Sequence, residues 1–161
     1  MTGRQTEVQA RTPYALVTAA EPPRPASKRE LVRISRELER AALAQPPPAV
    51  AAVLQDVRHL SDRTRTVYSQ LAEQGSDVRL HGRGLQAWLA PGVVGVALDD
   101  DDPLVDEWAV VVPGPLPVAF AATDLGTLGG ADADRAFLYA VSRDPQVVAD
   151  CARALGVPPA P

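Results

Sequence analysis

Side chains of the kind that bind small anions lie close together in one part of the sequence. Arg58 and Arg65 flank Ser61, which is expected to cap the start of a helix, and Gln55 ends the apolar segment before them. A helix N-terminus attracts negative charge, and a guanidinium group binds a carboxylate or a phosphate through paired hydrogen bonds. These features predict a small anion-tolerant pocket with five ligand-binding residues: Gln55, Arg58, His59, Arg65 and Tyr68.

Ion pairing within the protein is the alternative role for these arginines. Asp56 and Asp62 lie beside Arg58, Arg63 and Arg65, and the second half of the chain is acidic. Exposed ion pairs of this kind would occupy the guanidinium groups without any ligand. The sequence leaves both alternatives open.

A run of carboxylates is the second candidate for chemistry. Calcium loops alternate their ligands and place a glycine at a sharp bend, whereas this run contains four consecutive aspartates followed by the rigid Pro103. A catalytic carboxylate pair normally needs burial to raise one pKa, and a loop this charged is expected to stay in water. We therefore expect a solvated loop, with a weak cation site at 99–107 as the alternative. The acidic residues are Asp99, Asp100, Asp101, Asp102, Asp106 and Glu107.

Histidine and cysteine are too few to indicate a metal site or a thiol nucleophile. The chain has two histidines, His59 and His81, and one cysteine, Cys151, and their spacing matches no zinc motif. Cys151 falls on the inward face of the expected last helix, which is typical of a core residue. We predict no catalytic residue, no metal and no cofactor, and keep an uncharacterised hydrolase as a remote alternative.

The composition is that of a folded protein without a membrane segment. The chain has 161 residues, 46% hydrophobic and 22% charged, with a net charge of -4. Charge is uneven: residues 1–83 hold 13 basic and 9 acidic residues, and the rest of the chain holds 3 and 11. No dense basic face indicates direct nucleic-acid binding, and no apolar run approaches the roughly 20 residues of a membrane helix. We expect a cytoplasmic protein.

The elements that must position these side chains begin with helices and strands in alternation. Ser27 and Glu30 have the spacing of a capping box, which marks the start of an amphipathic helix. A nearly all-apolar segment then predicts a strand buried on both faces. The expected order is helix 28–43, strand 49–55, helix 62–74 and strand 77–82. Strand, helix and strand in about 30 residues form a βαβ crossover.

The second half predicts mainly strands. They are expected at 92–98, 107–112, 117–123 and 135–142, followed by a helix that starts at Asp144-Pro145. The resulting fold is a single α/β (α+β) domain: a mixed sheet of five to six strands, a βαβ crossover followed by an antiparallel meander, and three helices. The expected domain covers 27–157, after a flexible proline-rich leader at 1–26 and before a short tail at 158–161.

Four stretches resemble, in order and spacing, the DICT sensory domain. They are LVRISRELER, VAAVLQDVRHLSDRTRTVYSQLAEQGSDVRLHGRGL, DDPLVDEWAVVVPGPLPVAFAATDLG and RAFLYAVSRDPQVVADCARAL. The resemblance covers about Ser27 to Gly156. That family is a bacterial module named for its occurrence in diguanylate cyclases and two-component systems, and it is also found behind MerR-type DNA-binding heads. The resemblance implies a non-catalytic sensory module that regulates transcription or second-messenger signalling.

The resemblance also raises the question of a partner. The segment before Ser27 is too short and too rich in proline for a helix-turn-helix, so the signal is expected to pass to a partner regulator protein or a homodimer. The first helix offers a docking face at Arg33, Arg36 and Glu37, although alternating charges also occur on solvated faces held by i, i+4 pairs. A pure protein-interaction or dimerisation module without a small ligand is the alternative function. The sequence does not identify the signal.

Overall fold

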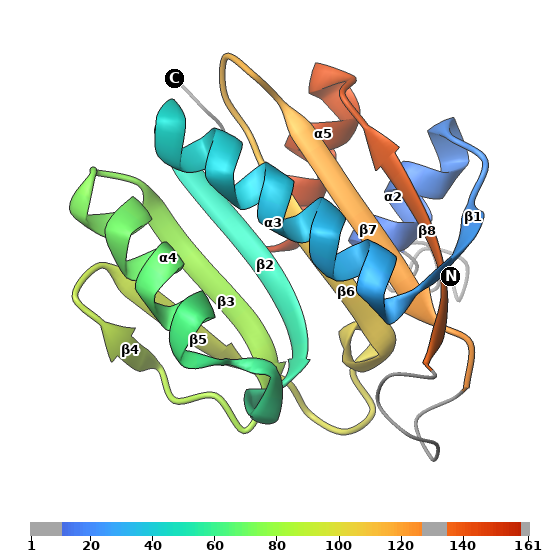
Figure 1. Cartoon of the computed structure of the whole chain (residues 1–161), viewed down its shortest axis with the longest axis horizontal. Coiled ribbons are helices and arrows are strands. Elements are labelled where there is room, and N and C mark those ends of the chain that lie inside the picture. Colours follow the sequence, from blue (N-terminus) through green and yellow to red (C-terminus); the bar gives the residue numbers. More distant parts are fainter. Residues whose placement is uncertain (1–10, 127–134, 159–161) are drawn as a thin grey trace, which may run out of the picture.

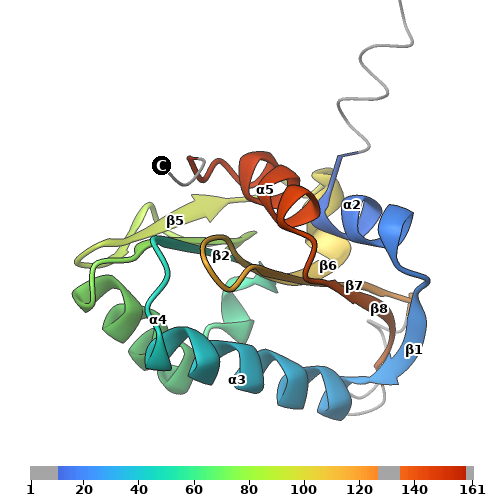
Figure 2. The ribbon, with the colours of Figure 1, turned by 90° about the horizontal axis from the view of Figure 1, so that it is seen from above.

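One mixed sheet organises the protein, with helices on both of its faces. The computed structural model describes residues 11–126 and 135–158. The sheet has eight strands in the order β1-β8-β7-β6-β2-β3-β5-β4. Figure 1 shows the strands crossing the molecule, and Figure 2 shows α3 and α4 on one face and α2 and α5 on the other.

The first half of the chain contains three of the four α-helices described. The elements are α2 Pro13–Ala20, β1 Arg24–Ser27, α3 Lys28–Ala44, β2 Ala49–Asp56, a 3₁₀ helix Val57–His59, α4 Asp62–Glu73, and β3 Asp77–Arg83. Helix α3 begins where the sequence predicts, because the Ser27 hydroxyl accepts a hydrogen bond from the Glu30 backbone N–H at 3.3 Å. Strands β2 and β3 are parallel neighbours joined through α4, which confirms the βαβ unit.

The second half adds strands on both sides of this unit. Its elements are β4 Trp88–Ala90, β5 Val93–Ala97, a 3₁₀ helix Pro103–Asp106, β6 Glu107–Val112, β7 Val118–Asp124, β8 Ala136–Ser142 and α5 Pro145–Ala154. Strands β6, β7 and β8 are antiparallel neighbours in sequence order, which confirms the predicted meander. Strand β6 then pairs antiparallel with β2, and this pairing joins the two halves into one sheet.

Three elements were not predicted, so the expected five to six strands and three helices are too few. Helix α2 and strand β1 lie within the segment expected to be a flexible leader, and β4 is a strand of three residues at the edge. Thr12 caps α2 by accepting from the Ala15 N–H at 3.2 Å, and Pro13 occupies its first turn. Val17 is fully buried against the sheet. Residues 1–10 of that leader and 159–161 of the tail lie outside the described residues.

Two cores lie on opposite faces of the sheet. The core under α3 and α4 includes Leu31, Leu71 and Phe120, and the core under α2 and α5 includes Val17 and Cys151. Cys151 is completely buried, which confirms its prediction as a core residue, and burial raises the pKa of its thiol to about 12. No helix in the described part of the chain combines the length and apolar composition of a membrane span.

The acidic run lies partly in water and partly inside the protein. Asp99, Asp100 and Asp101 are exposed, as expected of a solvated loop. Glu107 differs from that expectation, because it is only 5% exposed and accepts a hydrogen bond from the Tyr14 backbone N–H at 2.9 Å. Burial raises the pKa of Glu107 to about 7, and hydrogen bonds from Thr12 and Tyr14 oppose that rise. The Glu107 side chain therefore holds the start of α2 in place and is not part of a solvated loop.

Candidate functional site

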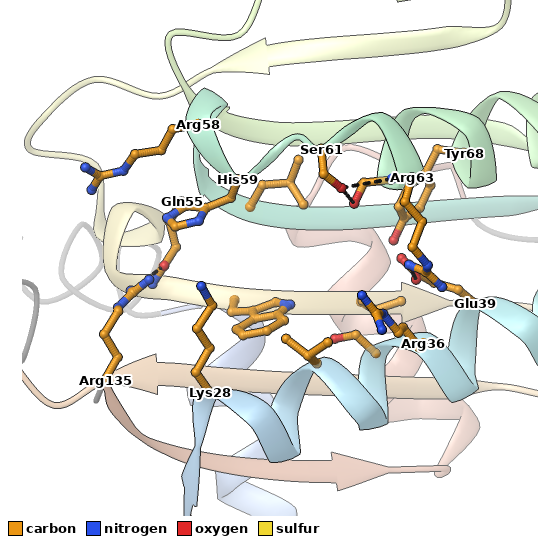
Figure 3. A pocket seen from close by; sticks show the side chains of 16 residues that line it. Lys28, Arg36, Glu39, Gln55, Arg58, His59, Ser61, Arg63, Tyr68 and Arg135 are labelled. Carbon is orange, nitrogen blue, oxygen red and sulfur yellow. Dashed lines mark hydrogen bonds and ion pairs between the residues drawn. The ribbon is translucent and has the colours of Figure 1, made fainter. Parts of the chain in front are cut away.

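A pocket of about 320 Å³ lies between α3 and α4, beside the carboxyl end of β2 and over β6 (Figure 3). Helix α3 lines it with a single face, because each lining position lies three or four residues from another lining position. The same core that packs α3 and α4 onto the sheet therefore holds the pocket walls in place. The residues that α3 contributes are Lys28, Val32, Ser35, Arg36 and Glu39.

Gln55 enters the pocket through an irregularity at the end of β2. The pairing register between β2 and β3 shifts between Val53 and Gln55, as in a β-bulge. Gln55 has a φ of 70°, the one positive φ of a non-glycine residue in the segments described. A left-handed conformation costs a residue with a side chain about 1–2 kcal/mol, so contacts of the side chain must hold it there.

Arg135 supplies one such contact. Its Nη2 donates to Gln55 Oε1 at 2.7 Å, and its Nε and Nη2 donate to Asp124 Oδ2 at 3.0 and 2.8 Å. The guanidinium carbon lies 5.0 Å from the centre of the Phe137 ring, within the range of a cation–π contact. Sequence reasoning missed Arg135 and Asp124. The sequence did contain one signal for this pair. Asp124 ends β7 and Arg135 directly precedes β8, so two opposite charges stand at strand ends that face each other in the hairpin of β7 and β8.

Four of the five predicted ligand-binding residues line this pocket: Gln55, Arg58, His59 and Tyr68. The fifth, Arg65, is exposed on α4 and is not among the lining residues. In α4 the pocket is lined by Arg63, Thr64 and Tyr68, whereas Arg65 is turned by about 100° from Thr64 and by about 200° from Arg63.

The predicted docking residues on α3 do not all face the same way. Arg33 and Glu37 form an exposed i, i+4 ion pair of 3.8 Å on the outer side of the helix. Arg36 lines the pocket, as well as a shallow groove along the outer surface of α3. Glu39, on the same helix, is buried and pairs with Arg63 of α4 at 3.2 Å. This pair joins the two helices above the pocket.

Four buried polar atoms on the pocket wall have no hydrogen-bond partner among the described residues. Two other such atoms, the Nε atoms of Arg79 and Arg83, lie outside this pocket. A buried polar group without a partner costs about 1–3 kcal/mol, so such groups are uncommon in folded proteins. The pocket therefore concentrates hydrogen-bonding capacity that the protein itself does not use. The four atoms are Ser35 Oγ, Gln55 Nε2, His59 Nε2 and the Tyr68 hydroxyl.

The pocket wall is strongly positive. It contains five cationic side chains and a single carboxylate, that of Glu39. The pKa of His59 is lowered to about 4, first by burial and then by the positive charges of Arg135, Lys28 and Arg58. His59 is therefore neutral at pH 7, and its ring is available as a neutral donor or acceptor. The five cationic residues are Lys28, Arg36, Arg58, Arg63 and Arg135.

Tyr68 remains a hydroxyl under all ordinary conditions. It is only 1% exposed, and burial raises its pKa well above the usual value, with a further contribution from the nearby carboxylate of Glu39. The Tyr68 hydroxyl lies close to Glu39 but makes no hydrogen bond of normal geometry there. It can therefore donate to, or accept from, a bound molecule.

A pocket with convergent polar side chains, beside the carboxyl end of a central strand, is where sheet proteins with helices on both faces commonly bind small molecules. The DICT family, described as a sensory domain in diguanylate cyclases and two-component systems, matches residues 13–123. The match covers more than half of the sequence, and the protein belongs to the DICT family.

Two solved structures share this fold at low sequence identity. A polyphosphate kinase from Porphyromonas gingivalis is similar with a TM-score of 0.52 and 13% identity over 88% of this chain and 26% of that chain. TrmBL2, described as an archaeal chromatin protein with a novel mode of DNA binding, has a TM-score of 0.52 and 12% identity. That match covers 96% of this chain and 58% of TrmBL2. The protein spans only part of both relatives, and the likeness concerns the fold alone.

No curated protein matches the sequence significantly. Within the described residues, no group of three or more His, Cys, Asp or Glu side chains could hold a metal ion.

Proposed function

We propose that this domain is the input module of a bacterial signalling system, and that it binds a small anionic ligand in the pocket between α3 and α4. Binding, rather than catalysis, is the proposed activity. The ligand would alter the regulation of transcription or of second-messenger synthesis through a partner regulator protein or a second copy of the chain. A cytoplasmic location and the absence of direct nucleic-acid contact remain part of this proposal.

The observation that carries the proposal is the set of four unpartnered polar atoms on one pocket wall. A ligand that hydrogen-bonds to Gln55 Nε2 and His59 Nε2 would remove the cost of leaving them unpaired. The surrounding positive charge favours a negative group at the same place. Hydrogen bonds from charged groups are worth about 1.5–3 kcal/mol each, so a few of them are enough for binding of a small anion.

Ligand binding would also link elements that are far apart in the sequence. Lys28 opens α3, Gln55 is the last residue but one of β2, and Arg135 precedes β8, and all three line the pocket. A ligand that contacts all three would favour one arrangement of α3 on the sheet over others, which is the basis of a population shift. The outer side of α3, with Arg33 and Glu37, would then present that change to a partner.

A protein-interaction module without a small ligand is the second candidate. The shallow groove along the outer surface of α3 favours it, because arginines outnumber glutamates there and would suit an acidic partner. The groove is lined by Lys28, Arg29, Glu30, Val32, Arg33, Arg36, Glu37 and Arg40.

Thermal unfolding separates the two candidates. We expect inorganic phosphate to raise the melting temperature of the wild-type protein more than the same concentration of chloride does, because a ligand that binds only the folded state stabilises it. Arg58→Ala should reduce that increase, whereas Arg65→Ala should retain it. An equal response to both salts in all three proteins would favour the interaction module.

A further inference from the structure

The two ends of the pocket differ in chemistry (Figure 3). Lys28, Gln55, His59 and Arg135 gather at one end, and Arg36, Glu39, Arg63 and Tyr68 gather at the other. Apolar side chains line the same pocket, namely Val32, Leu54, Trp108 and Val110. A molecule that fills the pocket therefore meets two polar regions and an apolar wall.

The first end suits an oxyanion. The Gln55 carbonyl is already engaged by Arg135, so the group that Gln55 can offer is the buried Nε2, which is a donor. Lys28 and Arg135 lie at this end, and both lower the pKa of His59, although Asp124 pairs with Arg135 at 2.8 Å and offsets part of its charge. A carboxylate or a phosphate accepts hydrogen bonds only, and it would meet donors and positive charge together here.

The second end suits a neutral hydroxyl group. The carboxylate of Glu39 is balanced by Arg63 at 3.2 Å. Arg36 also lies at this end, but its side chain is exposed and water screens its charge. Ser35 lies one helical turn before Glu39 on α3. Its Oγ and the Tyr68 hydroxyl are buried and lack partners among the described residues, and each can both donate and accept. A ligand hydroxyl could accept from Tyr68 and donate to Ser35 or Glu39, which a second anion could not do.

We propose that the ligand has two different ends: a carboxylate or phosphate bound near Gln55 and Lys28, and a neutral hydroxyl bound near Ser35 and Tyr68. A compact apolar spacer, such as a single ring, joins the two ends and packs against Trp108. The pocket volume of about 320 Å³ is at the lower end of the range for small-molecule sites, which limits the spacer to this size. This inference rests on the proposed function, because it specifies the ligand of the same pocket.

Isothermal titration calorimetry with four probes tests the proposal on the whole chain. 4-Hydroxyphenylacetate and 4-hydroxyphenyl phosphate have both ends, phenylacetate lacks the hydroxyl, and 4-methylphenol lacks the anion. We expect 4-hydroxyphenylacetate to bind about tenfold more tightly than phenylacetate, as for one hydrogen bond of about 1.4 kcal/mol, and 4-methylphenol to bind most weakly. The relative affinities of the carboxylate and the phosphate identify the anion.

Two variants test which end of the pocket binds the hydroxyl and which binds the anion. Tyr68→Phe should lower the affinity for 4-hydroxyphenylacetate to that of phenylacetate and leave phenylacetate unchanged, whereas Lys28→Met should weaken both by the same factor. Tyr139→Phe removes a hydroxyl that does not line this pocket and serves as the matched control. Melting curves of all three variants establish that they fold.

The outcomes separate this inference from the proposed function. If phenylacetate and 4-hydroxyphenylacetate bind equally well, and Tyr68→Phe changes neither, the two-ended ligand is wrong while the anion site stands. If no probe that carries an anion binds to the wild-type protein, both the inference and the proposed function are wrong.

Discussion

Arg135 Nη2 donates a hydrogen bond of 2.7 Å to Gln55 Oε1, although the two residues are 80 positions apart. Gln55 is the last residue but one of β2, Arg135 precedes β8, and strands β6 and β7 lie between β2 and β8 in the sheet. The bond therefore spans one end of the sheet. Because it engages the Gln55 carbonyl oxygen, it leaves the amide Nε2 as the unpartnered group on the pocket wall.

The first prediction concerns the strain at Gln55. Gln55→Ala should lower the free energy of unfolding by about 1–3 kcal/mol, because buried Arg135 loses an acceptor. Gln55→Gly loses the same side chain but adopts a positive φ without strain, so it should be more stable than Gln55→Ala by roughly 1 kcal/mol. Urea denaturation measures both. Equal stability of the two variants would contradict a strained left-handed backbone at this position.

The second prediction compares two arginines that are close in sequence. Arg58→Ala should weaken phosphate binding by about two- to fivefold, since Arg58 lines the pocket but its side chain is exposed and its charge is screened by water. Arg65→Ala removes the same charge from the exposed side of α4 and should change the affinity little. Calorimetric titration at two salt concentrations measures both affinities. Equal losses in the two variants would indicate a general charge effect instead of a pocket.

The third prediction concerns the ionisation of His59. Its pKa is lowered to about 4 by burial and by neighbouring cations, and a bound anion should raise it by offsetting that positive charge. His81 is the internal control. Burial also lowers its pKa, but its Nε2 lies 3.1 Å from the Leu155 carbonyl oxygen, away from the pocket.

NMR titration of both imidazoles, with and without phosphate, measures this effect. We expect an upward shift of the His59 pKa alone. A shift of the same size at His81, or none at His59, contradicts an anion bound beside the His59 ring.

The fourth prediction concerns Glu107 and the pH dependence of stability. Its pKa is raised from 4.5 to about 7 by burial. Between pH 4.5 and 7 the folded protein therefore keeps a proton on the Glu107 carboxyl group that the unfolded chain has lost. The stability contributed by this group is therefore complete below pH 4.5 and is lost as the pH rises towards 7. Glu107→Gln removes the titration and keeps an oxygen acceptor for the Tyr14 N–H.

The variant should therefore gain stability relative to the wild type as the pH rises from 5 to 8. Urea denaturation at several pH values measures the difference between the two proteins. Taking the difference removes the contribution of His59, whose lowered pKa changes stability in the opposite direction. Parallel curves for the two proteins would contradict a raised pKa at Glu107.

Local signals in the sequence were sufficient to predict most of the fold. The capping box at Ser27 defined the start of α3, and the apolar segment 49–55 predicted the buried central strand β2. The turn at Pro113-Gly114-Pro115 predicted the hairpin of β6 and β7, and Gly114 there has a φ of 126°, which favours glycine. Each of these features depends on residues within a few positions of one another.

Features that depend on distant contacts could not be predicted. Helix α2 has only eight residues and no clear amphipathic pattern, and it is stable because Val17 packs onto the sheet. Burial of Glu107 depends on α2, which lies 93 positions earlier. Arg135 joins the candidate site only because the sheet order brings the start of β8 to the same end as Gln55.

The central claim, that the pocket between α3 and α4 binds a small oxyanion, is tested most directly by NMR of the Gln55 side-chain amide during titration with inorganic phosphate. We predict that the Gln55 Nε2 resonances move saturably, with the same midpoint as the His59 ring, and that Arg58→Ala weakens both responses together. If those resonances stay unchanged while exposed arginines such as Arg65 respond, phosphate binds the surface and the claim is wrong.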